Sequence, residues 1–461
     1  MESRRSEKKN SKKIIRKAMI AKKLTALGMA VVLVFSLAAC GAADNGKLSS
    51  DTVKLKAAAM GDENAYKERV LGCPVGWEDC VQKFSVQLFQ QAYAQQSGAD
   101  RDNQDKADAA QSGSGFVLSP ASVLTALLMA EEGADGETAA QIQEAVGSEV
   151  FYAREAFQQI LNAKGEGTQV NTANSVWLRD DPNLQVQESF LAAMQQLFEA
   201  EVFSADFDKK TVKDINQWCK TNTKGRIEKI LNEPISPQTM LYLINALTFD
   251  GKWQSPYKDY QVGDADFTAA DGSVQTAEMM YGTEYTYLEN DLATGFVKPY
   301  ADGYSFVALL PHEGLSMADF VKGLSKDTFA RAWKVEKETP VETGLPKFKT
   351  ESGAELSEVL RTMGIRDLFD ADRADLHRTA TTPEGNLFVS KILHKAFIET
   401  DTEGTKAAAV TAVVDECGSA APSEMKRVIL DRPFFYAIIE EETGIPLFMG
   451  TVERIDRKSV V

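Results

Sequence analysis

Two long apolar runs constrain the fold of this chain more than any other feature. Met240 to Phe249 and Tyr304 to Leu310 are rich in apolar, β-branched and aromatic residues, as buried strands are. Gln185 to Ala200 and Leu356 to Met363 instead repeat apolar residues at helical spacing. Strands joined by long helical segments, without a strict βαβ alternation, predict an α+β domain with large sheets.

Near the start of this domain the pattern predicts two helices. Phe84 to Tyr93 keeps its apolar residues on one face, whereas Gln95 to Gly115 has no apolar period and is predicted to be a solvated loop. Ser119 and Pro120 then form a helix cap followed by a proline in the first turn. The helix from Ala121 to Glu132 is apolar on nearly every side, so we expect it in the core.

The N-terminus carries an export signal. The first 23 residues hold ten Lys or Arg and two acids, and the uncharged run from Leu24 to Ala39 ends in small side chains. This pattern predicts a signal peptide over residues 1–39, because the run is shorter than the roughly 18 to 20 residues of a membrane-spanning helix. The alternative is that these residues are cleaved off with no anchor remaining.

The residues that follow the apolar run suggest a lipid anchor. Leu37-Ala-Ala-Cys40 resembles the bacterial lipobox, in which the cysteine is acylated and becomes the mature N-terminus. The resemblance predicts a lipid on Cys40, a flexible tether over residues 40–70, and a place on the outer face of the cell membrane or, after release, in the extracellular space.

Charge and cysteine content exclude two further classes. Without residues 1–39 the chain has 41 Lys or Arg against 65 Asp or Glu, a net charge of −24, so nucleic acid is not an expected partner. Five cysteines are too few for a disulfide scaffold. Cys73 and Cys80 could form a local disulfide or remain two thiols, while Cys219 is predicted to be buried in a helix and Cys417 to be exposed in a loop.

The sequence contains no recognisable catalytic or metal-binding motif. His312, His377 and His394 fall in different predicted elements, and no zinc helix, nucleophile elbow or phosphate-binding glycine loop occurs. Ser423 and Lys426 have the spacing of penicillin-recognising enzymes, but the partner motifs of that family are absent. We therefore expect no catalytic residues, no cofactor and no metal.

A family resemblance then covers nearly the whole mature chain. Val428-Ile-Leu-Asp-Arg-Pro-Phe-Phe-Tyr-Ala-Ile438 resembles the signature that follows the reactive loop of serpins. Further segments resemble serpin motifs in the family's order: Ser119-Pro-Ala-Ser122, Gly133 to Thr138, Ala173-Asn-Ser175, Asn245 to Phe249 with Gly251 and Trp253, Leu345-Pro-Lys-Phe348, and His394-Lys-Ala396. The resemblance implies one domain over residues 71–461 with the serpin fold: a large central mixed sheet, two further sheets and eight to nine helices.

The resemblance also implies a polar cluster under the central strands, at the point where the sheet opens. The five residues could be a satisfied polar group in a core, or a group that must also release when the strands part, and these two roles are compatible. Its members are Ser119, Ser122, Asn174, Asn245 and His394.

The segment from Thr402 to Thr411 resembles the hinge of an inhibitory serpin, within a reactive loop over about 403–427. A loop that slides between two strands needs a glycine at its base and small side chains along its length. If it enters as a strand, alternate residues from Thr405 to Val413 face inward, Lys406 faces solvent, and Thr405 is the first inward residue to enter. The hinge comprises Gly404, Thr405, Lys406, Ala407, Ala408, Ala409, Val410 and Thr411.

Counting from the hinge glycine as in inhibitory serpins places the scissile bond at Gly418-Ser419. Asp415 would lie on the inward face, where an unpaired carboxylate costs several kcal/mol, so the bond could instead fall beside Glu416, Cys417, Ala420 or Ala421. Small residues there favour an elastase-like or subtilisin-like serine protease.

The resemblance therefore implies a protease inhibitor and not an enzyme. It would act as a monomer, and its partner would be a serine endopeptidase that is trapped as an acyl-enzyme when the cleaved loop inserts into the central sheet. The alternatives are a non-inhibitory serpin acting as a binding protein, an inhibitor of a papain-like cysteine protease, and a surface solute-binding lipoprotein or hydrolase.

Overall fold

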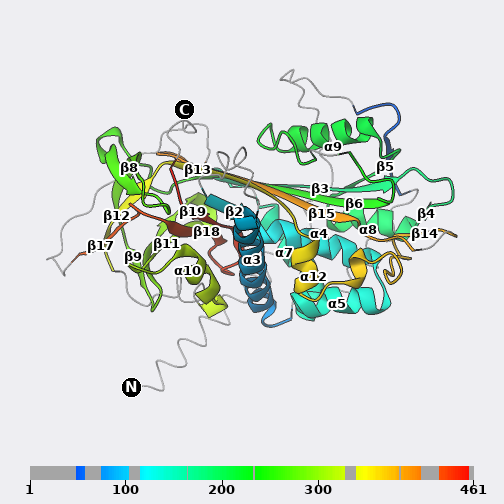
Figure 1. Cartoon of the computed structure of the whole chain (residues 1–461), viewed down its shortest axis with the longest axis horizontal. Helices are drawn as coiled ribbons and strands as arrows, with labels where there is room; N and C mark the ends of the chain where they lie inside the picture. Colours follow the sequence, from blue (N-terminus) through cyan, green and yellow to red (C-terminus); the bar gives the residue numbers. More distant parts are fainter. Residues whose placement is uncertain are drawn as a thin grey trace. The chain divides into compact units, whose positions relative to one another are not determined.

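The computed structural model describes residues 48–57, 74–102, 115–163, 165–231, 234–327, 339–383, 386–405 and 425–455. The chain divides into two units, Met1–Asn45 and Gly46–Val461, and all described residues belong to the second. This unit combines several sheets with nine α-helices among the described residues, as Figure 1 shows. The predicted α+β class is confirmed.

The largest sheet has seven strands and is mixed. Its β3–β5 and β6–β15 pairs are parallel, and its other pairs are antiparallel. The order across the sheet is β1 (Val53–Leu55), β5 (Glu201–Ala205), β3 (Thr168–Arg179), β6 (Leu241–Lys252), β16 (Gly404–Thr405), β15 (Lys391–Thr400) and β13 (Phe348–Glu355).

Three smaller sheets complete the β-structure of the described residues. Six strands follow the order β2 (Gly115–Leu118), β19 (Pro446–Val452), β18 (Phe434–Glu440), β11 (Tyr304–Pro311), β10 (Ala293–Pro299) and β9 (Thr286–Glu289). Four strands follow the order β17 (Lys426–Ile429), β12 (Val341–Pro346), β8 (Val274–Glu284) and β7 (Val262–Thr268), and β14 (Ala380–Thr381) pairs with β4 (Gln185–Val186). The predicted strands are confirmed in β6 and β11, and β11 is buried along its whole length.

The helices cover both faces of the seven-stranded sheet. Figure 1 shows α9 over one face, across β3, β5 and β6, and α4 with α7 and α8 on the other. The helices are α3 (Trp77–Asp102), α4 (Pro120–Gly133), α5 (Gly136–Val146), α6 (Ser148–Tyr152), α7 (Arg154–Leu161), α8 (Glu188–Leu197), α9 (Lys209–Asn222), α10 (Met317–Gly323) and α12 (Ser357–Thr362), with 3-10 turns at Asp259–Gln261, Ala301–Gly303 and Asp367–Phe369.

Helix α4 starts and packs as its sequence predicts. The Ser119 side chain accepts a hydrogen bond from the Ser122 backbone N–H at 3.2 Å, and Pro120 occupies the first turn, where no N–H is needed. All residues from Pro120 to Ala130 are buried, because the helix lies between the seven-stranded and six-stranded sheets. The core helix is confirmed.

The predicted loop at Gln95–Gly115 begins too early. Helix α3 continues through Gln95 to Asp102, since Gln and Ala are good helix formers that extend an already nucleated helix. The turn at 94–96 is exposed, which explains why its sequence shows no apolar period.

Part of the predicted tether also belongs to the folded unit. The strand Val53–Leu55 extends the edge of the seven-stranded sheet beside β5. Thr52 donates a hydrogen bond at 2.6 Å to Asp214 on α9, and Ser49 donates to the same carboxylate. The folded unit therefore includes residues before position 71. The sequence did not predict this, because three strand residues in a polar segment are too short a pattern.

The two described cysteines, Cys80 and Cys219, are free thiols. Cys219 is buried as predicted, and burial raises the pKa of its thiol to about 12, which keeps it unreactive. Cys40, Cys73 and Cys417 lie outside the described residues. No described helix is long and apolar enough to cross a membrane.

Candidate functional site

The central strands β6 and β15 fork along their length. They pair directly from Tyr242–Ile244 to Lys391–Leu393, and further along the two-residue strand β16 lies between them. We call the residues between these two points, Asn245–Asp250 and His394–Glu399, the insertion stretch. The site therefore consists of two adjacent strands with a third chain segment already wedged at one end.

The wedge is the N-terminal end of the predicted hinge. Thr405 pairs with Gly251 of β6 and with Thr400 of β15, and its side chain is buried. Its hydroxyl lies 2.5 Å from the Tyr300 hydroxyl and 3.4 Å from that of Thr400. The sequence suggested that Thr405 is the first inward-facing residue to enter the sheet during insertion. In the structure Thr405 is already part of the sheet.

Close backbone contact explains the hinge glycine. A Cβ on Gly404 would meet the Gly251 carbonyl oxygen at 2.0 Å, and a Cβ on Gly251 would meet the Phe249 ring at 2.4 Å. The turn before the wedge is tied by the Asp401 carboxylate, which accepts from the N–H groups of Glu403 at 2.8 Å and Gly404 at 3.1 Å. Larger residues would push β16 out of the fork.

Two aromatic residues hold the backbone of this turn. The Trp253 indole N–H donates to the Asp401 carbonyl at 2.9 Å, and the Tyr257 N–H donates to the Thr402 carbonyl at 2.9 Å. Both rings lie on the Lys298 ammonium, at 5.2 and 4.2 Å, and this cation pairs with Glu284 at 2.8 Å. Both side chains of the pair are buried, and this burial raises the pKa of the Glu284 carboxyl.

The five residues of the predicted polar cluster come together at the open end of the direct β6–β15 pairing. Asn245 and His394 are the next residues along the two strands, and Asn245 donates to the Asn174 side-chain oxygen. Asn174 in turn donates to the Phe198 carbonyl at 2.6 Å. All five side chains are at most 4% exposed, so the cluster connects α4, β3, β6 and β15 without water access.

His394 is held neutral in one tautomer. Its Nε2 accepts a hydrogen bond from the Ser119 N–H at 3.0 Å, which leaves the proton on Nδ1, 3.4 Å from the Ser122 hydroxyl. Ser122 can then donate to the Asn245 carbonyl at 3.5 Å. Complete burial lowers the pKa of His394 to about 3.

This histidine should make the fold sensitive to acid. The pKa of His394 in the folded protein, about 3, lies below its ordinary value of 6.5. The unfolded chain therefore binds the proton more tightly than the folded protein does, and protonation favours unfolding once the pH falls below 6.5. The neutral His394 makes its full contribution to the free energy of unfolding above pH 6.5, and about 2 kcal/mol of that contribution is lost at pH 5. Denaturant unfolding should therefore show that the free energy of unfolding falls more between pH 7 and pH 5 for the wild type than for His394→Gln. Equal losses would contradict the neutral, buried assignment.

The remaining predicted site residues lie outside the described part of the chain. These are the hinge positions from Lys406 to Thr411, the predicted bond at Gly418-Ser419 and its neighbours from Glu416 to Ala421. The structure describes the loop at its two ends, Thr405 and Met425.

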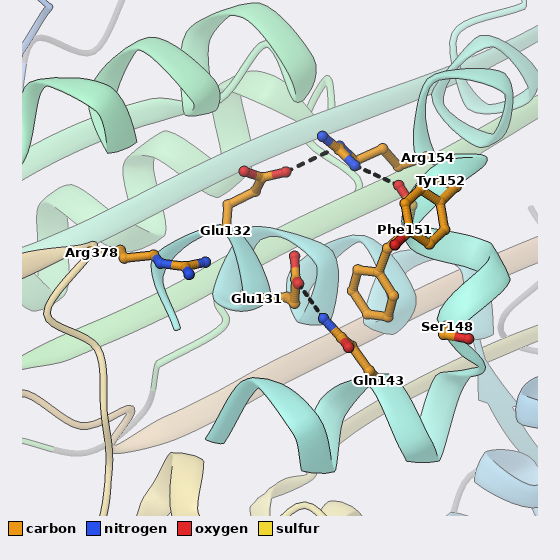
Figure 2. Close-up of a pocket in the computed structure, with 8 residues that line it drawn as sticks. All are labelled: Glu131, Glu132, Gln143, Ser148, Phe151, Tyr152, Arg154 and Arg378. Atoms are coloured by element: carbon orange, nitrogen blue, oxygen red, sulfur yellow. Dashed lines mark hydrogen bonds and ion pairs between the residues drawn. The ribbon is translucent and has the colours of Figure 1, made fainter. Parts of the chain in front are cut away.

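A separate pocket of about 400 Å³ lies beside the C-terminal end of α4, shown in Figure 2. Its two acids already have partners: Glu132 pairs with Arg154 at 3.0 Å, and Glu131 accepts a hydrogen bond from Gln143 at 2.7 Å. None of its lining residues is a histidine or a cysteine. Among the described residues, no group of three or more His, Cys, Asp or Glu could hold a metal ion.

Sequence reasoning missed the buried pair of Lys298 and Glu284 and the contact of Tyr300 with the hinge. One signal was present, because Lys298 is a lone charge in the otherwise apolar strand Ala293–Pro299. Its partner could not be identified, since Glu284 lies in another sheet and is one of 67 acids in the chain.

A forked central sheet with a glycine hinge between its strands agrees with the sequence resemblance, and the family comparison decides the matter. The sequence model of the family Serpin (serine protease inhibitor) matches residues 82–455. The chain belongs to the serpin family. The fold expected from the resemblance is confirmed, with a two-stranded ribbon in addition to the three larger sheets.

Similar serpins are named as protease inhibitors, which agrees with an inhibitor and not an enzyme. The plasma serine protease inhibitor of Bos taurus is 31% identical over 352 residues, covering 74% of this chain and 85% of the relative. The leukocyte elastase inhibitor of Bos taurus is also 31% identical, covering 73% of this chain and 92% of the relative.

Solved serpin structures match closely. The native state of the thermophilic serpin tengpin is 36% identical, with a TM-score of 0.72, and the match covers 83% of this chain and 95% of tengpin. The latent state of tengpin is 33% identical, with a TM-score of 0.69, and the match covers 84% and 99% of the two chains.

Proposed function

We propose that this serpin is a suicide inhibitor that traps a serine protease as an acyl-enzyme while the cleaved loop inserts between β6 and β15. The observation that carries the proposal is the position of β16: Gly404 and Thr405, the first two hinge residues, already lie between the two strands, antiparallel to both. Insertion then needs only continuation of an existing strand. The absence of a catalytic motif fits, because the catalytic residues belong to the target.

Continuing the register of β16 assigns each loop residue a place. Gly404 pairs with Lys252 and Thr405 with Gly251 and Thr400, so Ala407 would lie between Phe249 and Ile398. By the same count, Ala409 falls between Leu247 and Ala396, and Thr411 between Asn245 and His394. The small alanine side chains would thus meet buried residues of the insertion stretch, and a hydroxyl would meet the polar cluster.

The other face of the inserted strand is also matched. Lys406 falls between Glu399 and Asp250, and Asp250 already pairs with Arg226, so the loop's one cation in this span would lie next to two acids and one arginine. This is a more specific environment than the solvent expected from the sequence. Charge reversal of Lys406 should therefore slow insertion, since like charges opposite one another destabilise a sheet.

The same register gives Asp415 a partner. It places Asp415 beside Leu241 and Ser390, and the buried Ser390 hydroxyl has no hydrogen-bond partner among the described residues. A hydroxyl that donates to the carboxylate lowers the cost of its burial. The position of Asp415 therefore supports Gly418-Ser419 as the scissile bond.

The decisive test is a covalent complex. The mature domain is mixed with a panel of serine and cysteine proteases and run on a denaturing gel, and we expect an SDS-stable complex with an elastase-like or subtilisin-like serine protease. The small residues around Gly418 and the similarity to a leukocyte elastase inhibitor support this target class. Loop cleavage without complexes would mean a non-inhibitory serpin, and complexes with papain-like proteases alone would move the target to cysteine proteases.

We also propose that the inhibitor is a monomer held on the outer face of a membrane by a lipid on Cys40. The basic N-terminus, the short apolar run and the Leu-Ala-Ala-Cys sequence support this. Cys40→Ser should abolish acylation, so the variant should appear in the medium or stay unprocessed, as checked by fractionation and labelled palmitate. A wild-type protein found in culture fluid with a mature terminus other than Cys40 would contradict it.

A further inference from the structure

The outer side of helix α9 carries a line of lysines. Lys209, Lys213 and Lys220 are exposed, and with 3.6 residues per turn their spacing places the three side chains within an arc of about 40°. The buried residues of α9, among them Trp218, lie on the opposite side of the helix and pack on the seven-stranded sheet (Figure 1). The three lysines, which we call the lysine face, therefore point away from the sheet.

Such a concentration of positive charge stands out in an acidic chain. Residues 209–229 hold seven Lys or Arg against two acids, a net charge of +5, whereas the chain from residue 40 onward has a net charge of −24. Lys220 pairs with Glu228 at 3.0 Å, and both side chains of that pair are at least half exposed. Among the described residues, Lys209 and Lys213 have no ion-pair partner. The lysine face is therefore available to an anionic partner.

Helix α9 also holds the point at which the described chain begins. Ser49 and Thr52 donate to the Asp214 carboxylate at 2.5 and 2.6 Å. Leu48 packs against the hydrophobic cluster beneath the helix. Eight residues lead from Cys40 to Leu48, and an extended chain spans them in at most about 29 Å. The predicted lipid is thus tied to the α9 side of the domain by a short segment.

This segment is shorter than the domain is wide. A folded domain of about 400 residues has a radius of gyration of about 21 Å, so it is more than 40 Å across. The side of the domain opposite α9 could not face a membrane that holds Cys40, because the segment would then have to pass around the domain. A lipid on Cys40 would therefore keep α9 on the membrane side.

We propose that the lysine face of α9 binds the anionic lipid headgroups of the membrane that holds Cys40. This inference rests on the proposed lipid anchor, and it adds a second membrane contact that sets the orientation of the inhibitor. A basic face next to an acyl anchor holds a protein firmly on an anionic surface, because the two contributions multiply in the binding constant.

The negative charge of the whole chain does not prevent this contact. At physiological ionic strength the Debye length is about 8 Å, so charges on the far side of the domain are screened from the membrane. The exposed acids of this segment lie at its two ends, with Asp206 and Asp208 before the helix and Glu228 after it. The membrane would therefore meet mainly the lysines.

The test is the triple variant Lys209→Gln/Lys213→Gln/Lys220→Gln, made in the chain from residue 40 with Cys40→Ser, so that no acyl group contributes. The measured quantity is the partition coefficient onto vesicles of phosphatidylcholine and phosphatidylglycerol in equal parts. Each lysine near an anionic surface strengthens binding roughly fivefold, so we expect the triple variant to bind about a hundredfold more weakly than the parent chain. Binding of the parent chain should weaken as salt is added and be absent on pure phosphatidylcholine.

The matched control is Lys83→Gln/Lys258→Gln/Lys322→Gln, which removes the same charge from exposed lysines on other elements. It should bind the anionic vesicles as the parent chain does. Equal binding by the lysine-face variant and the parent would overturn the proposal, as would an equal loss in the control. Binding of the parent to dextran sulfate but not to the anionic vesicles would also overturn it, and would assign the face to an acidic polysaccharide.

A second measurement uses the acylated protein on the same vesicles. An amine reagent should modify the lysine face more slowly on anionic than on neutral vesicles, and the three control lysines should react at similar rates on both. Equal rates at the lysine face on the two kinds of vesicle would contradict the contact.

The two proposals can fail separately. A chain without a lipid on Cys40 contradicts the anchor, but the partition of the non-acylated chain still tests the lysine face. An acylated protein whose lysine face binds no anionic lipid contradicts this inference and leaves both the anchor and the inhibitory function intact.

Discussion

Replacing Ala409 with arginine should turn the inhibitor into a substrate. The register of β16 places Ala409 between Leu247 and Ala396, which are 2% and 0% exposed, on the face that packs against the core. A guanidinium there has no partner, and burying it costs several kcal/mol. Each 1.4 kcal/mol added to the insertion barrier slows insertion about tenfold, so hydrolysis of the acyl-enzyme should win and release active protease.

Ala408→Arg is the matched control for this substitution. Residue 408 falls on the opposite face, beside Thr248 and Phe397. A long cation fits on that face, since Lys395 reaches Glu351 there at 2.6 Å. We expect Ala408→Arg to need close to the wild-type ratio of inhibitor to protease, and Ala409→Arg to need about ten times more or to form no complex. If Ala408→Arg is the more damaging change, the assignment of the two faces is wrong.

Cleavage of the loop should raise the thermal midpoint of the wild-type protein by on the order of 10 °C or more. An inserted strand gains backbone hydrogen bonds on both sides, each worth about 1 kcal/mol net, and the midpoint rises by a few degrees for each kcal/mol. In the proposed mechanism the intact fold is kinetically trapped, because the loop joins the sheet as a strand only after it is cut.

The measurement compares calorimetric melting of intact and loop-cleaved protein. Cleaved Ala409→Arg is the control, and its midpoint should rise much less, because its strand stalls near the hinge. An unchanged or lower midpoint for cleaved wild type would mean that the loop does not insert.

Local sequence patterns were sufficient to predict structure where the burial of a segment follows from its own residues. The apolar run at Tyr304–Leu310 has to be buried on both faces, and the capped apolar helix from Ala121 has to lie in the core. The polar cluster at Asn245 and His394 followed from the family resemblance, and its residues do meet, although no local sequence feature links segments 149 residues apart.

Features made by contacts between distant segments could not be predicted. Thr405 reads as part of a free loop, yet its pairing with Gly251 and Thr400 places it inside the sheet. The strand Val53–Leu55 depends on an edge supplied by β5, and Asp214 fixes its position from a third element. Hydrophobic patterning reports burial along one segment and carries no information on such partners.

Hydrogen exchange in the insertion stretch tests the central claim most directly. In intact protein, the amides of Asn245–Asp250 and His394–Glu399 that face each other across the fork should exchange quickly, because β6 and β15 pair directly only at Tyr242–Ile244 and Lys391–Leu393. After the loop is cleaved by a target protease, these amides should become as protected as those between β3 and β6. Unchanged exchange in this stretch, with the loop demonstrably cut, would contradict insertion between β6 and β15.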